Sequence, residues 1–228
     1  MSLPHELRRA GAITWKDLTT ERRSLANVNA VLFLALLMLL LFGFALGPDA
    51  EALRSASAGM LWLAVLFSGV LAFNRSYQLE LDHGALEVLL QYPGARWPIF
   101  AGKLVANLVF VLLVEVIVVP LAAVLYQSPI GGTLPSLAGV LLLGTTGFVT
   151  LGTFYAALAS RSRAREVLLP LLLFPMLVPV LIAAVRATDA LVSGDLVNDA
   201  GAWVRLLVVF DVLFLVTCFL VFDEVIGE

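Results

Sequence analysis

The chain alternates long apolar runs with short polar segments. Six of the runs approach or exceed the roughly 20 residues that a helix needs to cross about 30 Å of hydrocarbon. We predict transmembrane helices at 29–46, 58–75, 98–126, 134–160, 166–186 and 202–222. The pattern therefore predicts an all-α membrane protein of six transmembrane helices, in a single membrane domain over residues 1–228.

The first 28 residues carry a different pattern. An apolar stripe recurs at helical spacing, and the basic residues lie on other faces; the stripe consists of Leu3, Leu7, Ala10, Thr14 and Leu18. Such a pattern is typical of an amphipathic helix that lies in a membrane surface. We predict an N-terminal interfacial helix over 3–26. A simple topology signal would explain its charges but not its stripe.

Composition agrees with a membrane protein. Hydrophobic residues make up 61% of the 228 residues, charged residues 14%, and the mean hydropathy is +1.01. A soluble domain of this length does not need so much apolar surface for its core. The single cysteine, Cys218, lies in an apolar run and excludes a disulfide framework.

Lysine and arginine placement predicts the orientation. Eleven of these residues lie in the N-terminal segment and the second and fourth loops, whereas Arg54, Arg186 and Arg205 lie on the opposite side. Cytoplasmic loops carry the excess of positive charge. Both termini and the second and fourth loops are therefore expected in the cytoplasm.

Several catalytic motifs are absent from the sequence. It contains no GxxxxGK[ST] phosphate loop, no HExxH and no GxSxG. Both histidines, His5 and His83, fall outside the predicted spans. We therefore expect no catalytic residue, no metal site and no ATP site in this chain, which is not an enzyme on its own.

Two carboxylates, Glu115 and Asp211, lie near the centres of predicted spans. A charge there costs about 2.5–3.5 kcal/mol, so each group needs a partner, a wet cavity or a proton. The two acids act either as a polar gate or relay, or as interhelical hydrogen bonds that fix packing.

Small residues and prolines mark two of the predicted helices. A small-residue stripe in the fourth span predicts close helix packing; it consists of Thr146, Thr150, Thr153 and Ala157. Proline bends or locally unwinds a helix, and it occurs at Pro170, Pro175 and Pro179 in the fifth span and at Pro120 in the third. A bent helix suits a transporter that changes shape, but the same prolines are equally compatible with a static kink.

The polar segment between the second and third spans, "DHGALEVLLQYPG", contains a short apolar stretch. We predict a helix within 82–92, with Asp82 as N-cap and Tyr92-Pro93-Gly94 as its stop. Leu86, Leu89 and Leu90 form its apolar face. At about 14 Å it is too short to cross a bilayer. It either rests on lipid or enters a groove on another protein.

The order and spacing of several stretches resemble a known family. They include "FGFALGPD", "GMLWLAVLFSGVLAFNRSYQLELDHGALEVLLQYP", "LLGTTGFVTLGT" and "SRSRAREVLLPLLLFPMLVPVLIAAV". A six-span chain with an N-terminal interfacial helix and such a loop resembles the ABC-2 type of permease. It is more closely similar to the cytochrome c maturation protein B (CcmB) family of haem exporter permeases.

This resemblance implies a complex in the prokaryotic inner membrane. Two copies of the chain would pair with a cytosolic ATPase (CcmA-like), a haem-handling membrane protein (CcmC-like) and a small single-span subunit (CcmD-like). The short loop helix would be the coupling helix that docks in the ATPase; its expected docking residues are Asp82, Gly84, Leu86, Glu87, Leu90 and Gln91. ATP and Mg²⁺ would bind the partner, and no nucleic acid is involved.

The function that the resemblance implies is haem export, or release of a haem-loaded chaperone. Haem usually needs a His, Met, Cys or Tyr ligand. No histidine lies in the predicted spans or on the exoplasmic side, and the methionines and Cys218 fit packing. We expect this subunit to transmit movement rather than ligate haem. The alternatives are export of lipid or polysaccharide, and a non-transporting scaffold for an ATPase-driven complex.

Overall fold

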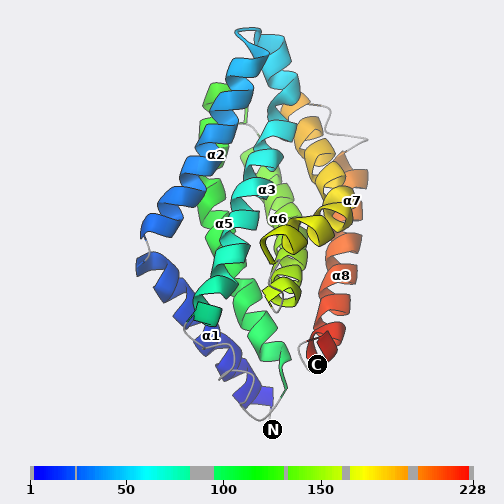
Figure 1. The fold of residues 1–228 in the computed structure, drawn as a ribbon. Coiled ribbons are helices and arrows are strands. Elements are labelled where there is room, and N and C mark those ends of the chain that lie inside the picture. The colour runs from blue at the N-terminus through cyan, green and yellow to red at the C-terminus, as the bar shows by residue number, and fades with distance from the viewer. Residues whose placement is uncertain are drawn as a thin grey trace.

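The computed structural model describes residues 3–23, 25–82, 95–130, 133–160, 165–194 and 200–225. These residues form helices joined by short turns, with no strand among them (Figure 1). The helices are α1 (Leu3–Arg23), α2 (Leu25–Leu46), α3 (Ala50–Asp82), α5 (Trp97–Leu125), α6 (Leu134–Ser160), α7 (Arg165–Ser193) and α8 (Ala200–Val225).

Six of the helices, all except α1, are long and apolar enough to cross a membrane. The predicted six-span, all-helical architecture is confirmed. Four spans are longer than predicted, α3 and α7 by the most. α3 begins at Ala50 because Asp49 caps it, its Oδ1 accepting from the amides of Glu51 and Ala52 at 3.0 and 3.4 Å. α7 continues to Ser193 and is followed by Gly194, whose φ of +82° suits a helix C-cap.

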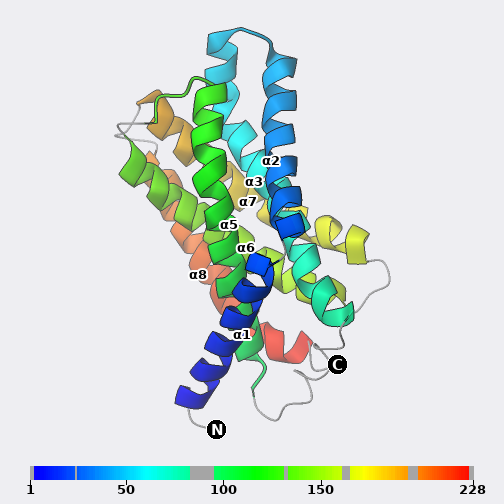
Figure 2. The same cartoon turned by 90° about the vertical axis from the view of Figure 1, so that its left-hand side faces the viewer.

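The spans run up and down in one bundle with both chain termini at the same end (Figure 1). α3 ends and α5 begins at this end, which we call the terminal end. α3 and α6 are the most buried spans, while α2 and α8 expose most of their surface. Figure 2 shows α2 and α5 side by side, with α1 below α2 and along the lower part of α5.

α3 and α6 pack closely because one helix has a glycine where the other has a ring. A Cβ at Gly152 of α6 would lie 2.1 Å from the ring of Phe73 in α3. The Phe73 ring in turn packs on Phe148, with ring centroids 4.9 Å apart. In the predicted small-residue stripe, Thr150, Thr153 and Ala157 are buried and Thr146 is half-buried.

The four prolines lie inside continuous helices, Pro120 in α5 and the other three in α7. Figures 1 and 2 show that α7 changes direction, its first turns crossing the bundle and the remainder running along it. The prediction that these prolines serve a change of shape stays a prediction.

α1 occupies most of the segment predicted as an interfacial helix. The described residues of its predicted stripe differ in exposure: Leu7 is exposed, while Ala10, Thr14 and Leu18 are half-buried. The buried positions of α1 are instead Glu6 and Ile13. That this helix rests on a membrane surface stays a prediction.

The predicted coupling helix lies almost wholly outside the described residues. Gly84, Leu86, Glu87, Leu90 and Gln91 fall within 83–94, and only Asp82, the last residue of α3, is described. The roles predicted for these six residues therefore stay predictions.

Candidate functional site

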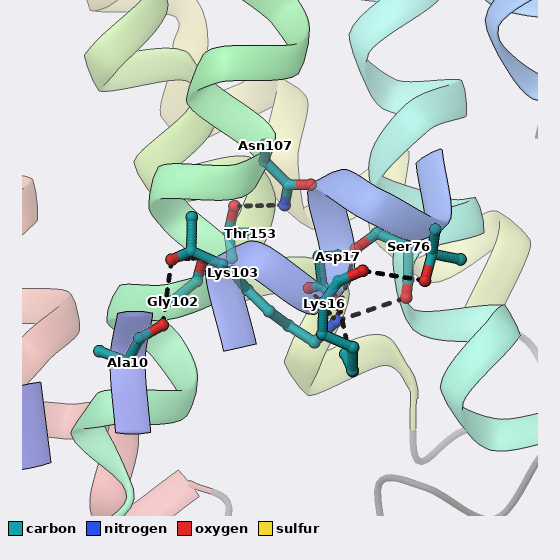
Figure 3. Close-up of polar contacts among 10 residues, drawn as sticks. Ala10, Lys16, Asp17, Ser76, Gly102, Lys103, Asn107 and Thr153 are labelled. Atoms are coloured by element: carbon teal, nitrogen blue, oxygen red, sulfur yellow. Dashed lines mark hydrogen bonds and ion pairs between the residues drawn. The ribbon is translucent and has the colours of Figure 1, made fainter. Parts of the chain in front are cut away.

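A cluster of polar contacts surrounds Lys103, near the start of α5. The side chain of Lys103 is fully buried. Its Nζ lies 3.2 Å from Oδ2 of Asp17 in α1, and it donates to the carbonyl and hydroxyl oxygens of Ser76 in α3 at 3.4 and 3.5 Å. It also lies 4.5 Å from the ring centroid of Tyr77. One ammonium group therefore joins α1, α3 and α5 (Figure 3).

Lys103 is one of the eleven basic residues predicted above for the cytoplasmic segments, as a charge of the second loop, and this prediction was wrong. α5 begins at Trp97 with Pro98 in its first turn, where a missing amide hydrogen costs nothing, so Lys103 lies inside the helix. A buried ammonium needs a partner of opposite charge and further acceptors. Asp17 and Ser76 supply them from helices that are distant along the chain.

The polar contacts continue away from Lys103 on both sides. Asp17 also pairs with Lys16, whose Nζ lies 3.1 Å from Oδ1. One turn further along α5, Asn107 donates to the hydroxyl of Thr153 in α6 at 2.9 Å (Figure 3). We call these residues, Lys16, Asp17, Ser76, Lys103, Asn107 and Thr153, the Lys103 network. Its contacts involve four helices: Lys103 joins α5 to α1 and α3, and Asn107 joins α5 to α6.

α1 and α5 approach each other closely at Gly102, next to the network. A Cβ at Gly102 would lie 2.8 Å from both the carbonyl oxygen of Ala10 and the Cβ of Ile13. Thr14 donates its hydroxyl to the Gly102 carbonyl at 3.0 Å. Only glycine leaves room for this contact.

At the terminal end of the bundle, two arginines form hydrogen bonds between segments that are distant in the sequence. Arg9 of α1 pairs with Glu6 at 2.8 Å and donates to the carbonyl of Ala95 at 3.3 Å. The amide of Arg96 donates to Oδ1 of Asp223 in α8 at 3.1 Å. The residues just before α5 are thus held by the first and the last helix of the chain. Nothing in the sequence pattern identified these contacts, because each joins distant segments.

The two intramembrane acids both lie against α6. Glu115 of α5 accepts a hydrogen bond from the hydroxyl of Thr145. Asp211 of α8 lies beside Gly147, where an added Cβ would come within 2.5 Å of its Oδ1. Both side chains are buried. Within the described residues, Oε2 of Glu115 and both carboxyl oxygens of Asp211 have no hydrogen-bond partner.

These positions bear on the alternatives for the two acids. The Thr145 contact gives Glu115 an interhelical hydrogen bond, as the packing alternative requires. Asp211 has no such bond to the described part of the chain. In the same part, no three His, Cys, Asp or Glu side chains lie close enough to hold a metal ion.

Comparison with known proteins gives consistent matches. The family described as CcmB protein matches residues 8–223. The heme exporter protein B of Rhodobacter capsulatus is 34% identical over 171 residues, covering 75% of this chain and 78% of the relative. The proteins of the same name from Pseudomonas aeruginosa and Escherichia coli K12 are 31% and 32% identical over 173 and 175 residues. These alignments cover 76% of this chain and 77% and 79% of those relatives.

Proposed function

Because the chain belongs to the CcmB family, we propose that it is the membrane subunit of a complex that exports haem for cytochrome c maturation. The observation that carries this proposal is the family match over residues 8–223, which includes nearly all of the six spans. Relatives named heme exporter protein B support the choice of haem over lipid or polysaccharide.

In this proposal ATP is hydrolysed by a partner subunit. The chain has no phosphate-binding loop of its own. The complex contains two copies of this chain, a CcmA-like ATPase, a CcmC-like haem-handling protein and a CcmD-like single-span subunit. It lies in the inner membrane with the terminal end of the bundle in the cytoplasm, as the excess of Lys and Arg at this end favours.

The contacts at the terminal end supply a route by which the ATPase would act. The segment 82–92 lies between the end of α3 and the start of α5. A displacement of this segment would move Ala95 and Arg96. Ala95 is hydrogen-bonded to Arg9 of α1, and Arg96 is hydrogen-bonded to Asp223 of α8. Lys103 then connects α5 to α1 and α3. Movement of one loop is therefore passed to four helices.

Haem ligation is assigned to the partner subunits. The two histidines are His5 and His83, neither of them in a transmembrane span. Cys218 is a buried packing residue of the core. The chain's part in the proposal is to transmit movement, which yields either haem export or release of a haem-loaded chaperone.

Complementation tests the function. In a bacterium that lacks its own CcmB-family protein, we expect all c-type cytochromes to be lost and to return when this chain is expressed with its partner subunits. Haem staining of membrane proteins after electrophoresis measures both effects. Normal insertion of the chain without return of the cytochromes would show that the proposal is wrong.

A second experiment separates haem export from its alternatives. Vesicles containing the complete complex, ATP and haem should accumulate haem in the lumen if the complex is an exporter. Release of a loaded chaperone without luminal haem indicates the remodelling mechanism. ATP-dependent movement of labelled lipid, without either, indicates the lipid-exporting alternative.

Docking of the ATPase is tested with Leu86→Asp and Leu90→Asp. Each change places a carboxylate on the predicted apolar face of the coupling helix, so we expect loss of ATPase co-purification with insertion intact. Leu134→Asp is the matched control, because Leu134 is exposed at the start of α6, at the opposite end of the bundle. Co-purification of both loop variants at the unmodified ratio would contradict the docking role.

A further inference from the structure

A groove of about 440 Å³ lies where α1, α2 and α5 meet. Its walls are apolar and come from the two spans, with Val28 and Leu32 from α2 and Leu113 from α5. Its polar end is formed by Glu21 and Arg22 of α1. Figure 2 faces this side of the molecule, where α2 and α5 run side by side above α1.

The apolar walls continue into the surface that faces the membrane. Leu113 is 60% exposed and Ile117, another wall residue, is 53% exposed. Both belong to α5, a span with a mean hydropathy of 3.0. The groove therefore opens to hydrocarbon along the spans and ends at charged groups on α1. A ligand that fits it must be apolar along its length and charged at one end.

The charged end favours an anion. Arg22 is exposed there and carries a permanent positive charge. Burial raises the pKa of its neighbour Glu21, and Asp17 raises it further, although Arg75 acts in the opposite direction. The Glu21 carboxyl, which accepts a hydrogen bond from Asn27, is therefore less readily ionised than a free glutamate.

We propose that an anionic phospholipid occupies this groove, with an acyl chain along α2 and α5 and its phosphate beside Arg22. A basic residue near a membrane surface attracts anionic lipid. The proposal does not depend on which substrate the complex transports.

A transmembrane helix of a second copy fits the groove less well. Such a helix is about 10–12 Å wide and must continue past the membrane surface. α1 lies across that path, below α2 and against α5. An acyl chain is thinner and ends inside the membrane, so α1 does not obstruct it.

The lipid would also bear on the Lys103 network. Glu21 lines both the groove and a cavity of about 20 Å³ that Asp17, Ser76 and Asn107 also line. About one water molecule fits such a space. A lipid headgroup at Arg22 therefore lies next to Glu21, which lines the cavity beside the Lys103 network. A lipid in the groove should hold α1 against α5.

Photolabelling tests the proposal on the full-length chain in vesicles of phosphatidylethanolamine and phosphatidylglycerol. The probes are phosphatidylglycerol and phosphatidylethanolamine, each with a photoactivatable acyl chain. We expect phosphatidylglycerol to label α2 and α5 around Leu32 and Leu113. Arg22→Gln should lower this labelling about fivefold relative to phosphatidylethanolamine. Arg8→Gln, a change at an exposed arginine of α1 that does not line the groove, should not.

A second pair of variants tests the groove itself. Leu113→Trp fills it and should lower labelling by both lipids, whereas Leu142→Trp, at an exposed leucine of α6, should have no effect. Equal labelling of the Leu142 surface and the groove would overturn the proposal. So would an Arg22→Gln protein with an unchanged lipid ratio, or disulfide cross-linking of two copies through Leu113→Cys in membranes.

Discussion

Lys103 and Asp211 are ionisable side chains buried in different ways. Lys103 meets the carboxylate of Asp17 and two oxygens of Ser76. Asp211 occupies space left by Gly147 and has no hydrogen-bond partner among the residues described. The first residue has a clear structural role, whereas the second is a buried carboxyl that no hydrogen bond from the described residues compensates.

The contact between Lys103 and Asp17 can be broken by changing either residue, and we expect the two changes to lower the stability of the fold by different amounts. Asp17→Asn leaves the buried ammonium without its carboxylate and should cost about 3 kcal/mol in the free energy of unfolding. Lys103→Met should cost less, because Asp17 keeps its contact with Lys16 and methionine retains the packing. Thermal unfolding in mild detergent measures both.

The double variant supplies the control for this comparison. Asp17→Asn combined with Lys103→Met should cost less than the sum of the single changes, because neither charge is then left behind. Strict additivity would show that the two side chains do not stabilise each other.

Gly147→Ala should displace the Asp211 side chain. The added methyl would lie 2.5 Å from Oδ1 of Asp211 and 3.2 Å from Val180, so we expect a loss of about 1–3 kcal/mol in stability. Gly139→Ala on the same helix meets nothing within 4 Å and is the matched control. Adding Asp211→Ala should restore much of the Gly147→Ala loss if the carboxyl is the obstacle. Thermal unfolding in mild detergent measures each loss.

At the scale of elements, α1 shows where sequence reasoning succeeds and where it does not. Its amphipathic pattern predicted a helix separate from the first span, and α1 ends at Arg23 before α2 begins at Leu25. Its inward face was missed because it includes two acidic residues, Glu6 and Asp17, and one partner of Asp17, Lys103, lies in α5. Asp17 becomes an inward residue only once α5 supplies Lys103.

Gly102→Leu should detach α1 from α5. A side chain at Gly102 collides with the backbone of Ala10, which cannot move without moving the helix. We expect trypsin to cut α1 after Lys16 faster in this variant than in the unmodified protein, by limited proteolysis in detergent. Gly11→Ala lies on α1 in open space and should leave the cleavage rate unchanged.

At the scale of the whole molecule, the number of spans followed from the sequence because each run is long and apolar enough by itself. The arrangement did not. That α3 and α6 lie at the centre depends on contacts such as Phe73 against Gly152, which bring together distant residues. Glu115 and Asp211 were found as acids in apolar runs, but their common neighbour α6 was not.

The bundle also predicts the sidedness of its loops. Arg54 donates to the carbonyl of Gln127 at 3.0 Å, which joins the start of α3 to the α5–α6 connection at the end opposite to the termini. We expect a cysteine placed at Gln127 to react with an impermeant maleimide from outside intact cells. A reporter enzyme that works only in the cytoplasm should be active when it is fused to either terminus. An inactive reporter at either terminus would contradict this orientation.

The contact between Asp17 and Lys103 sets an order of events during synthesis. The two residues are 86 positions apart, so Lys103 leaves the ribosome roughly 4–17 s after Asp17 at ordinary rates of translation. During this interval two complete spans enter the membrane while α1 has no α5 to receive it. The first helix made therefore reaches its final place only with the third span, and its docking marks the completion of the first half of the bundle.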